Sequence, residues 1–182
     1  MGMLSYRFKH VVAALCVFAA FPVLAAPIDD LFDRLADAEG ETQGRIEAQI
    51  IAEWEKSGSP AMDLLMRRGK DAMADSEPDA ALDHFSALID HAPDFAEGYA
   101  ARASAYFALG MIGPALDDLR QTLVLNPRHF AAMQGVGAIL EGFDEPARAL
   151  EAYRAVLQLN PQSQDVLDAV ARLTLELEGQ AL

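Results

Sequence analysis

The sequence has very little cysteine. Its single cysteine, Cys16, lies inside an apolar run near the N-terminus and follows Leu15, where a lipoprotein signal would carry a small residue. We therefore expect no lipid anchor at this position. From residue 17 onward the chain has no thiol, which excludes disulfides, thiolate nucleophiles and cysteine metal sites there.

Basic residues are also scarce. The chain has 14 Lys and Arg against 28 Asp and Glu, a formal net charge of −14. This balance disfavours nucleic acid, because binding to phosphates depends on clustered Lys and Arg. We expect the partner to be another protein or a peptide, and the acidic charge would favour a basic one. The alternative is that the acidic surface serves only to keep the protein in solution.

Only one stretch of the sequence, residues 11–24, is a long uncharged apolar run, and two basic residues precede it. Val23 and Ala25 place small residues two apart, as signal peptidase requires. We predict a secretory signal peptide over residues 1–25, cleaved after Ala25, and therefore a periplasmic or secreted protein. The alternative is an uncleaved anchor, but the run is shorter than the roughly 20 residues that span a bilayer.

Residues for catalysis or metal binding are few after the apolar run. His84 and His91 are seven positions apart, so one helix would separate them by roughly 10 Å and they cannot share a metal. Asp30, Asp33 and Asp37 fall on one helix face, which we interpret as a solvated surface. No glycine-rich phosphate loop and no strand pattern is visible. We expect no cofactor, no metal and no enzymatic activity.

The chain repeats itself with a period of 34 residues. Pro93, Pro127 and Pro161 are related by this step. Within each unit, apolar residues return every three or four places, a spacing that predicts two amphipathic helices. Small packing residues follow the same step at Gly69, Ala103 and Gly137. Large ones follow it at Phe85, Leu119 and Tyr153.

The middle unit resembles the tetratricopeptide repeat. The residues that carry the resemblance are Tyr99-x3-Ala103-x2-Tyr106-x3-Gly110-x4-Ala115-x11-Pro127. The resemblance implies an all-α protein, a right-handed α-solenoid of antiparallel helix pairs. We predict three repeats, at residues 62–95, 96–129 and 130–163. Two departures are Arg102, at a position the family usually fills with an apolar residue, and Asp144, which replaces the glycine of the inter-helix turn.

Helical patterns also flank the three repeats. Residues 26–61 predict a degenerate N-terminal helical hairpin, in which Glu47 stands where a small crossing residue belongs and Trp54 is expected to pack internally. Residues 164–182 predict a capping helix and a tail, because the last repeat of a solenoid would otherwise expose its stacking face.

The resemblance also implies a concave groove lined by the first helix of each repeat. Transferring the family's groove positions gives a floor of mixed apolar and acidic character. These candidate residues are Asp63, Met66, Lys70, Met73, Glu97, Ala100, Ser104, Phe107, Ala131, Gln134, Ala138 and Glu141. Met66, Met73 and Phe107 would either contact a partner or be covered by the N-terminal hairpin, and the sequence leaves both open.

Some family members bind a C-terminal carboxylate with Lys, Asn and Arg in this groove, and that arrangement is not reproduced. Three of its places are held by Met66, Ala101 and Ala131. Arg67, Arg68 and Lys70 form a basic cluster. We expect Asp63, four residues before Arg67, to pair with it on the helix surface.

These features predict an exported, non-catalytic protein that binds a peptide or helix of an envelope partner in its groove. One alternative is an assembly or stability scaffold within a larger envelope complex. A more remote alternative is a non-catalytic subunit of an enzyme, since packing residues occupy the places where catalysis needs polar clusters.

Overall fold

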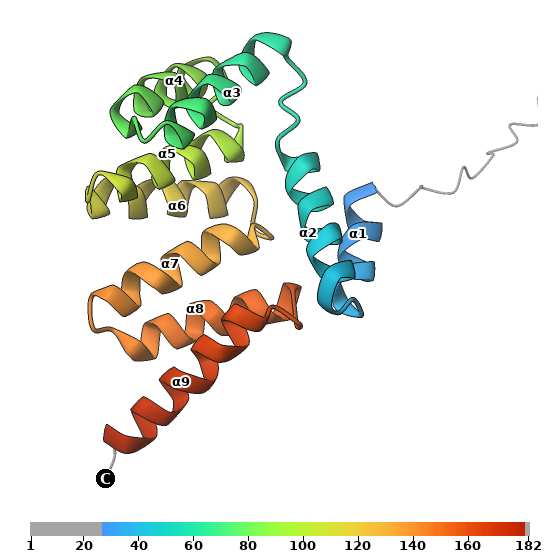
Figure 1. The fold of residues 1–182 in the computed structure, drawn as a ribbon, viewed down its shortest axis with the longest axis vertical. Coiled ribbons are helices and arrows are strands. Elements are labelled where there is room, and N and C mark those ends of the chain that lie inside the picture. Colours follow the sequence, from blue (N-terminus) through green and yellow to red (C-terminus); the bar gives the residue numbers. More distant parts are fainter. Residues whose placement is uncertain (1–26, 181–182) are drawn as a thin grey trace, which may run out of the picture.

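A computed structural model describes residues 27–180 of the protein (Figure 1). The predicted signal peptide at residues 1–25 lies outside the described residues. The described part is helical throughout, in nine helices joined by short turns. Their bounds are α1 Pro27–Ala36, α2 Gly40–Trp54, α3 Pro60–Ala74, α4 Pro78–His91, α5 Ala96–Ala108, α6 Ile112–Leu125, α7 Phe130–Gly142, α8 Pro146–Leu159 and α9 Gln164–Gln180.

Six of these helices form three antiparallel pairs, α3–α4, α5–α6 and α7–α8, and each pair stacks on the next (Figure 1). Helix α9 then packs against α8. The predicted all-α solenoid of helix pairs is therefore confirmed. Residues of α3, α5 and α7, the first helix of each pair, line a common surface, which we call the concave face.

The helices of a pair cross where one side chain is nearly absent. A Cβ atom on Gly137 in α7 would lie 2.8 Å from Cε1 of Tyr153 in α8. Glycine is thus required at this crossing because the tyrosine ring occupies the space that a methyl group would fill. The ring is itself buried at 6% exposure and has little room to move.

The turns inside the three pairs share one backbone conformation. Gly110 adopts a φ of +70° between α5 and α6, and the residues 34 positions before and after it, Ser76 and Asp144, adopt φ values of +62° and +59°. Asp144 therefore keeps the left-handed geometry of the glycine that it replaces. Asp tolerates this region better than most residues with a side chain do.

Arg102 is accommodated by an acidic partner on the next helix. Its Nε donates to Oδ2 of Asp118 at 2.7 Å and its Nη2 donates to Oδ1 at 2.9 Å, a bidentate ion pair between α5 and α6. The guanidinium also lies 5.7 Å from the ring centres of Tyr99 and Tyr106. The hydrogen bonds that Arg102 donates to Asp118 raise the pKa of Arg102 despite the opposing effect of burial.

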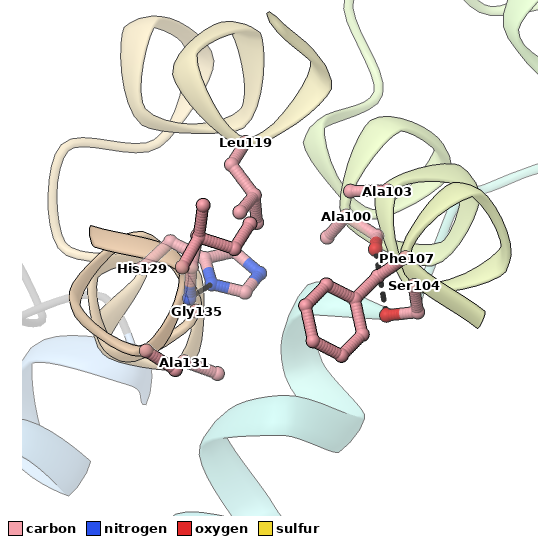
Figure 2. Close-up of a pocket in the computed structure, with 11 residues that line it drawn as sticks. Ala100, Ala103, Ser104, Phe107, Leu119, His129, Ala131 and Gly135 are labelled. Atoms are coloured by element: carbon pink, nitrogen blue, oxygen red, sulfur yellow. Dashed lines mark hydrogen bonds between the residues drawn. The ribbon is translucent and has the colours of Figure 1, made fainter. Parts of the chain in front are cut away.

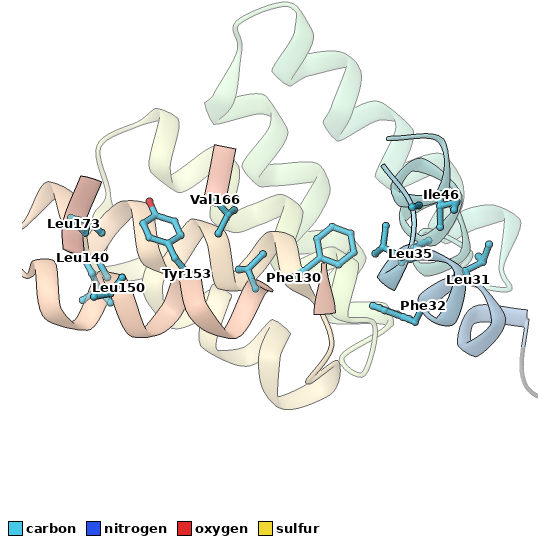
Figure 3. Packing of buried hydrophobic residues seen from close by; sticks show 14 residues of the cluster. Leu31, Phe32, Leu35, Ile46, Phe130, Leu140, Leu150, Tyr153, Val166 and Leu173 are labelled. Atoms are coloured by element: carbon cyan, nitrogen blue, oxygen red, sulfur yellow. The ribbon is translucent and has the colours of Figure 1, made fainter. Parts of the chain in front are cut away.

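The α1–α2 hairpin shares its hydrophobic core with the third helix pair and α9. Leu35 and Ile50 are fully buried in this core (Figure 3). It also contains Phe130 of α7, Tyr153 of α8 and Leu173 of α9. The hairpin therefore folds back across the stack, although it precedes the first pair in sequence.

Polar contacts hold the hairpin in the same place. The Gln43 amide donates to the Asn160 side-chain oxygen at 3.0 Å, and the Asn160 amide in turn donates to Glu47. Arg128 pairs with Asp29 at 2.6 Å. Glu47, which breaks the repeat pattern, thus has a function of its own: it binds the buried Asn160 at the far end of the third pair.

Candidate partner-binding groove

The concave face contains an open pocket between α5 and α7, with a volume of about 260 Å³. Figure 2 shows Phe107 and Ser104 on one side of this pocket and Ala131 and Gly135 on the other. We call it the α5–α7 pocket. Its lining residues are Ala100, Ala103, Ser104, Phe107, Leu119, His129, Ala131, Ala132, Gly135, Ala138 and Ile139.

The α5–α7 pocket is apolar and wide because small residues line both helices. Phe107 stands at its edge with 53% of its surface exposed, while Leu119 and Ile139 are buried within the lining. The Ser104 hydroxyl donates to the Ala100 carbonyl oxygen at 3.1 Å, so its proton is already bonded. A large apolar side chain fits this environment better than a charged one does.

Glu97, one of the acidic groove candidates, is bonded inside the protein. It is 9% exposed, and its Oε1 lies 2.8 Å from Nε2 of His129. The other ring nitrogen, Nδ1, accepts the backbone N–H of Ala132 at 3.0 Å and caps the start of α7. Because Nδ1 is an acceptor, the proton lies on Nε2 and is donated to Glu97.

Glu141 has partners on two other helices. Arg172 of α9 pairs with it at 2.6 Å, and the Tyr153 hydroxyl donates to it at 3.2 Å. The hydrogen bond from Arg172 lowers the pKa of Glu141. Burial, followed by the Glu141 charge, raises the pKa of Tyr153. Glu141 thus links α7 to α9.

The charged candidates of the first repeat contact the segment that precedes it. Lys70 pairs with Glu55, the C-cap residue directly after α2. Asp63 accepts hydrogen bonds from the backbone and hydroxyl of Ser57. The ion pair expected between Asp63 and Arg67 does not form in the described part of the chain, because the Asp63 carboxylate is turned toward Ser57.

The end of α2 covers one part of the concave face. Ile51 and Trp54 of α2 line a second cavity of about 200 Å³ with residues of all three groove helices. Met66 in this cavity is only 5% exposed, whereas Phe107 is open to solvent. Met73 is half-buried and packs against the core of the first repeat. Met66 is therefore the candidate that lies beside the hairpin, and contact between Phe107 and a partner stays a prediction.

Comparison with known proteins agrees with this geometry. The chain is 31% identical over 153 residues to a TPR repeat-containing protein of Rhizobium etli, covering 84% of this chain and 75% of that protein. The chain belongs to the tetratricopeptide-repeat (TPR) family. No family model matches it.

Other TPR proteins match over shorter stretches. The chain is 28% identical over 110 residues to Hsp70-Hsp90 organizing protein 1 of Glycine max, which covers 60% of this chain and 19% of that protein. Among solved structures, the first TPR of Spaghetti (RPAP3) bound to the HSP90 peptide SRMEEVD has a TM-score of 0.61 and 24% identity. It covers 64% of this chain and 93% of that one.

The TPR fold brings some of the predicted groove residues together and separates others. Ala100, Ser104, Phe107, Ala131 and Ala138 line the α5–α7 pocket. The residues around the second cavity are Met66, Lys70, Glu97, Ala100, Ser104 and Ala131. The remaining candidates, which line neither space, are Asp63, Met73, Gln134 and Glu141.

His129 and Trp54 belong to this TPR groove, although the sequence did not place them there. The Trp54 ring stacks on the His129 ring at a centroid distance of 4.6 Å and an angle of 20°. Trp54 also packs 5.1 Å from Phe130, as expected of an internal packing residue. A short-range pattern could not reveal this pair, because α2 and α7 are distant in sequence.

The exposed acidic face on α1 is solvated, as predicted. Asp30 and Asp33 of α1 and Asp37, which follows this helix, are all exposed, and Asp30 pairs with its neighbour Arg34 at 3.5 Å. Between residues 27 and 180, no group of three His, Cys, Asp or Glu side chains is placed to hold a metal ion. Over the same residues, every helix is too short or too polar to span a membrane.

Proposed function

We propose that this TPR protein is an exported, non-catalytic interaction protein whose α5–α7 pocket binds a large apolar side chain of a partner protein. The observation that carries the proposal is the open pocket itself. Alanine is the commonest of its lining residues, and the exposed Phe107 borders it. Apolar concave sites with few polar groups are the usual places where a partner's anchor residue binds.

The charges around the groove support an apolar anchor rather than a basic one. Each acidic groove candidate is already bonded within the protein: Asp63 to Ser57, Glu97 to His129 and Glu141 to Arg172. A basic partner would compete with these bonds. An aliphatic or aromatic side chain would bury apolar surface without breaking any of them.

The relatives support a peptide-sized ligand. A TPR domain of the same fold has been solved with a bound peptide. We propose the same kind of ligand here, an extended segment or a helix of another protein. The positions that bind a terminal carboxylate in some TPR proteins carry Met66, Ala101 and Ala131 in this chain, so recognition would depend on an apolar side chain.

Export is part of the proposal and rests on the apolar run at residues 11–24 and the small residues before the predicted cleavage site. It places the partner in the periplasm or outside the cell. Sequencing the N-terminus of the protein from an envelope fraction would test export directly. A chain that begins at Ala26 supports it, and an intact N-terminus in the cytosolic fraction contradicts it.

Site-specific photo-crosslinking in cells tests the pocket. A photoreactive phenylalanine analogue at position 107 should crosslink one defined protein segment, identified by mass spectrometry. Substituting Ala138→Trp, which fills the pocket, should abolish this crosslink. A matched control places the same analogue at Val124, an apolar residue on α6 that is 67% exposed and outside the groove.

The segment identified in this way should bind the purified chain, and Phe107→Asp should weaken its binding while Val124→Asp should not. Both variants should keep the wild-type helical melting curve. Crosslinks that form equally from positions 107 and 124, or that persist in Ala138→Trp, would rule out the α5–α7 pocket as the binding site.

A further inference from the structure

The second cavity and the α5–α7 pocket are parts of one groove. They share Ala100, Ser104, His129 and Ala131. The α5–α7 pocket is lined by His129 and by residues of α5, α6 and α7, whereas Ile51 and Trp54 from the last turn of α2 also line the second cavity. A helix of the chain itself therefore lies where a partner helix would lie in a TPR groove.

The α2 end is held in the groove by an aromatic contact and an ion pair. Trp54 stacks on His129 at 4.6 Å, and the next residue, Glu55, pairs with Lys70 of α3. Lys70 is a cation of the predicted groove, and 46% of its side chain is exposed. The chain thus presents to its own groove an aromatic side chain followed directly by a carboxylate.

His129 forms a fixed surface for the aromatic ring. Its two nitrogens are both bonded, one to the Ala132 backbone on α7 and one to Glu97 on α5. These two bonds fix the ring orientation, and only a ring face is left for stacking, the face that Trp54 covers. A preorganised flat surface of this kind favours a planar side chain in any segment that replaces α2.

If the end of α2 left the groove, Trp54 would lose its contacts with Phe130 at 5.1 Å and Phe32 at 6.1 Å, but earlier turns of α2 would keep theirs. Gln43 and Ile50 hold the hairpin on the third repeat from earlier turns of α2. The segment that follows α2 contains Gly58 at a φ of +75° and leads directly into α3. Opening of one terminal helical turn costs far less than unfolding of a domain.

From this arrangement we infer that the last turn of α2 is an internal ligand that occupies one end of the groove until a partner segment replaces it. The partner segment would carry an aromatic residue followed by Asp or Glu, to stack on His129 and pair with Lys70. This inference rests on the proposed function, because it specifies which residues the bound partner segment carries and how the end of α2 regulates its binding in the same groove.

A synthetic peptide with the sequence of residues 43–57, labelled at its N-terminus, tests the inference by fluorescence anisotropy. In the full chain with Trp54→Ala, the position of the indole ring in the groove is vacated. This variant should bind the peptide about tenfold more tightly than wild type does, because only the fraction of molecules with a free site contributes to the apparent affinity. A peptide carrying Trp54→Ala should lose this binding. A chain with both Trp54→Ala and Lys70→Glu should prefer a peptide carrying Glu55→Lys.

A second variant keeps the inference testable if Trp54→Ala misfolds. Glu55→Lys keeps the aromatic ring but places a cation beside Lys70, so the end of α2 should leave the groove. Trp54 is the sole tryptophan, and its emission in this variant should shift to longer wavelength while the helical content is retained. The same variant should bind the peptide more tightly than wild type does.

Equal peptide affinity for wild type, Trp54→Ala and Glu55→Lys would overturn the inference. A peptide affinity that Lys70→Glu leaves unchanged would also overturn it. A wild-type chain that sediments as a dimer with exchanged hairpins would also overturn it, because the occupant would then come from a second copy. Crosslinking at position 107 would still succeed in these cases if the proposed function is correct, so the two failures are distinguishable.

Discussion

A Cβ atom on Gly69 of α3 would lie 2.6 Å from Cζ of Phe85 on α4. Phe85 is 1% exposed and lies in the core of the first repeat, so its ring cannot move aside easily. The contact joins a residue without a side chain to one of the largest side chains in the protein. The same pairing recurs one period on in Ala103 and Leu119 and two periods on in Gly137 and Tyr153.

Replacing Gly69 with alanine should therefore destabilise the protein. Alanine normally favours a helix interior by about 1 kcal/mol over glycine, but overpacking a core costs about 1 to 3 kcal/mol. We expect a net loss of up to about 2 kcal/mol in urea unfolding. The matched control is Gly44→Ala in α2, where no atom lies within 4 Å of the new Cβ and a gain is expected. Equal effects at both positions would contradict this account.

Asp118→Leu should leave the Arg102 guanidinium without its bidentate partner. The Arg102 side chain is only 20% exposed, so the loss should be about 2 to 3 kcal/mol, less than for a fully buried pair. Adding Arg102→Leu should recover most of this loss, because two apolar residues replace the ion pair at little cost. Chemical denaturation of the single and double variants measures the coupling, and additive losses would show that the pair is not coupled.

The Glu141–Arg172 pair should make stability depend on acid pH. The pKa of Glu141 is lowered in the folded protein, chiefly by the hydrogen bond from Arg172. Its contribution is therefore complete above the ordinary carboxyl pKa and disappears as pH falls through the lowered value. Glu141→Gln should cost about 0.5 kcal/mol at neutral pH, since the pair is partly exposed, and progressively less as the pH falls through the lowered pKa. A difference between variant and wild type that persists in acid would contradict this assignment.

Ser76→Gly should stabilise the first repeat. Ser76 holds a φ of +62° with a side chain, whereas Gly110 holds the same conformation without that penalty. We expect a gain of about 0.5 to 1 kcal/mol and a higher thermal midpoint. Gly110→Ala is the reverse control and should lower the midpoint. A lower midpoint for Ser76→Gly would show that its hydroxyl matters more than the backbone strain.

The solenoid could be predicted from sequence because its contacts are short-range. Gly137 meets Tyr153, 16 residues later, so the period of 34 carries the packing information directly. The groove charges could not be predicted in the same way. Lys70 binds Glu55 of the hairpin and Glu141 binds Arg172 of the last helix, and the repeat pattern does not specify partners outside the repeat.

The position of the α1–α2 hairpin could not be predicted from the repeat pattern either. Stepping back by one period gives apolar residues in repeat-like positions, among them Leu35 and Trp54, but it does not say which surface they cover. That choice depends on Phe130 and Asn160, which lie about one hundred residues further along the chain. Local periodicity therefore predicts the helices of the hairpin but leaves its position undetermined.

The hydrogen bond between Gln43 and Asn160 joins residues 117 positions apart. In an open solenoid each unit contacts only its neighbours, so folding can spread from any point and either end can unravel alone. Here α1 and α2 acquire their buried partners only after the third repeat and α9 have been synthesised. The slow step of folding should therefore be closure of this long loop. Once closed, the two ends of the described chain protect each other from fraying.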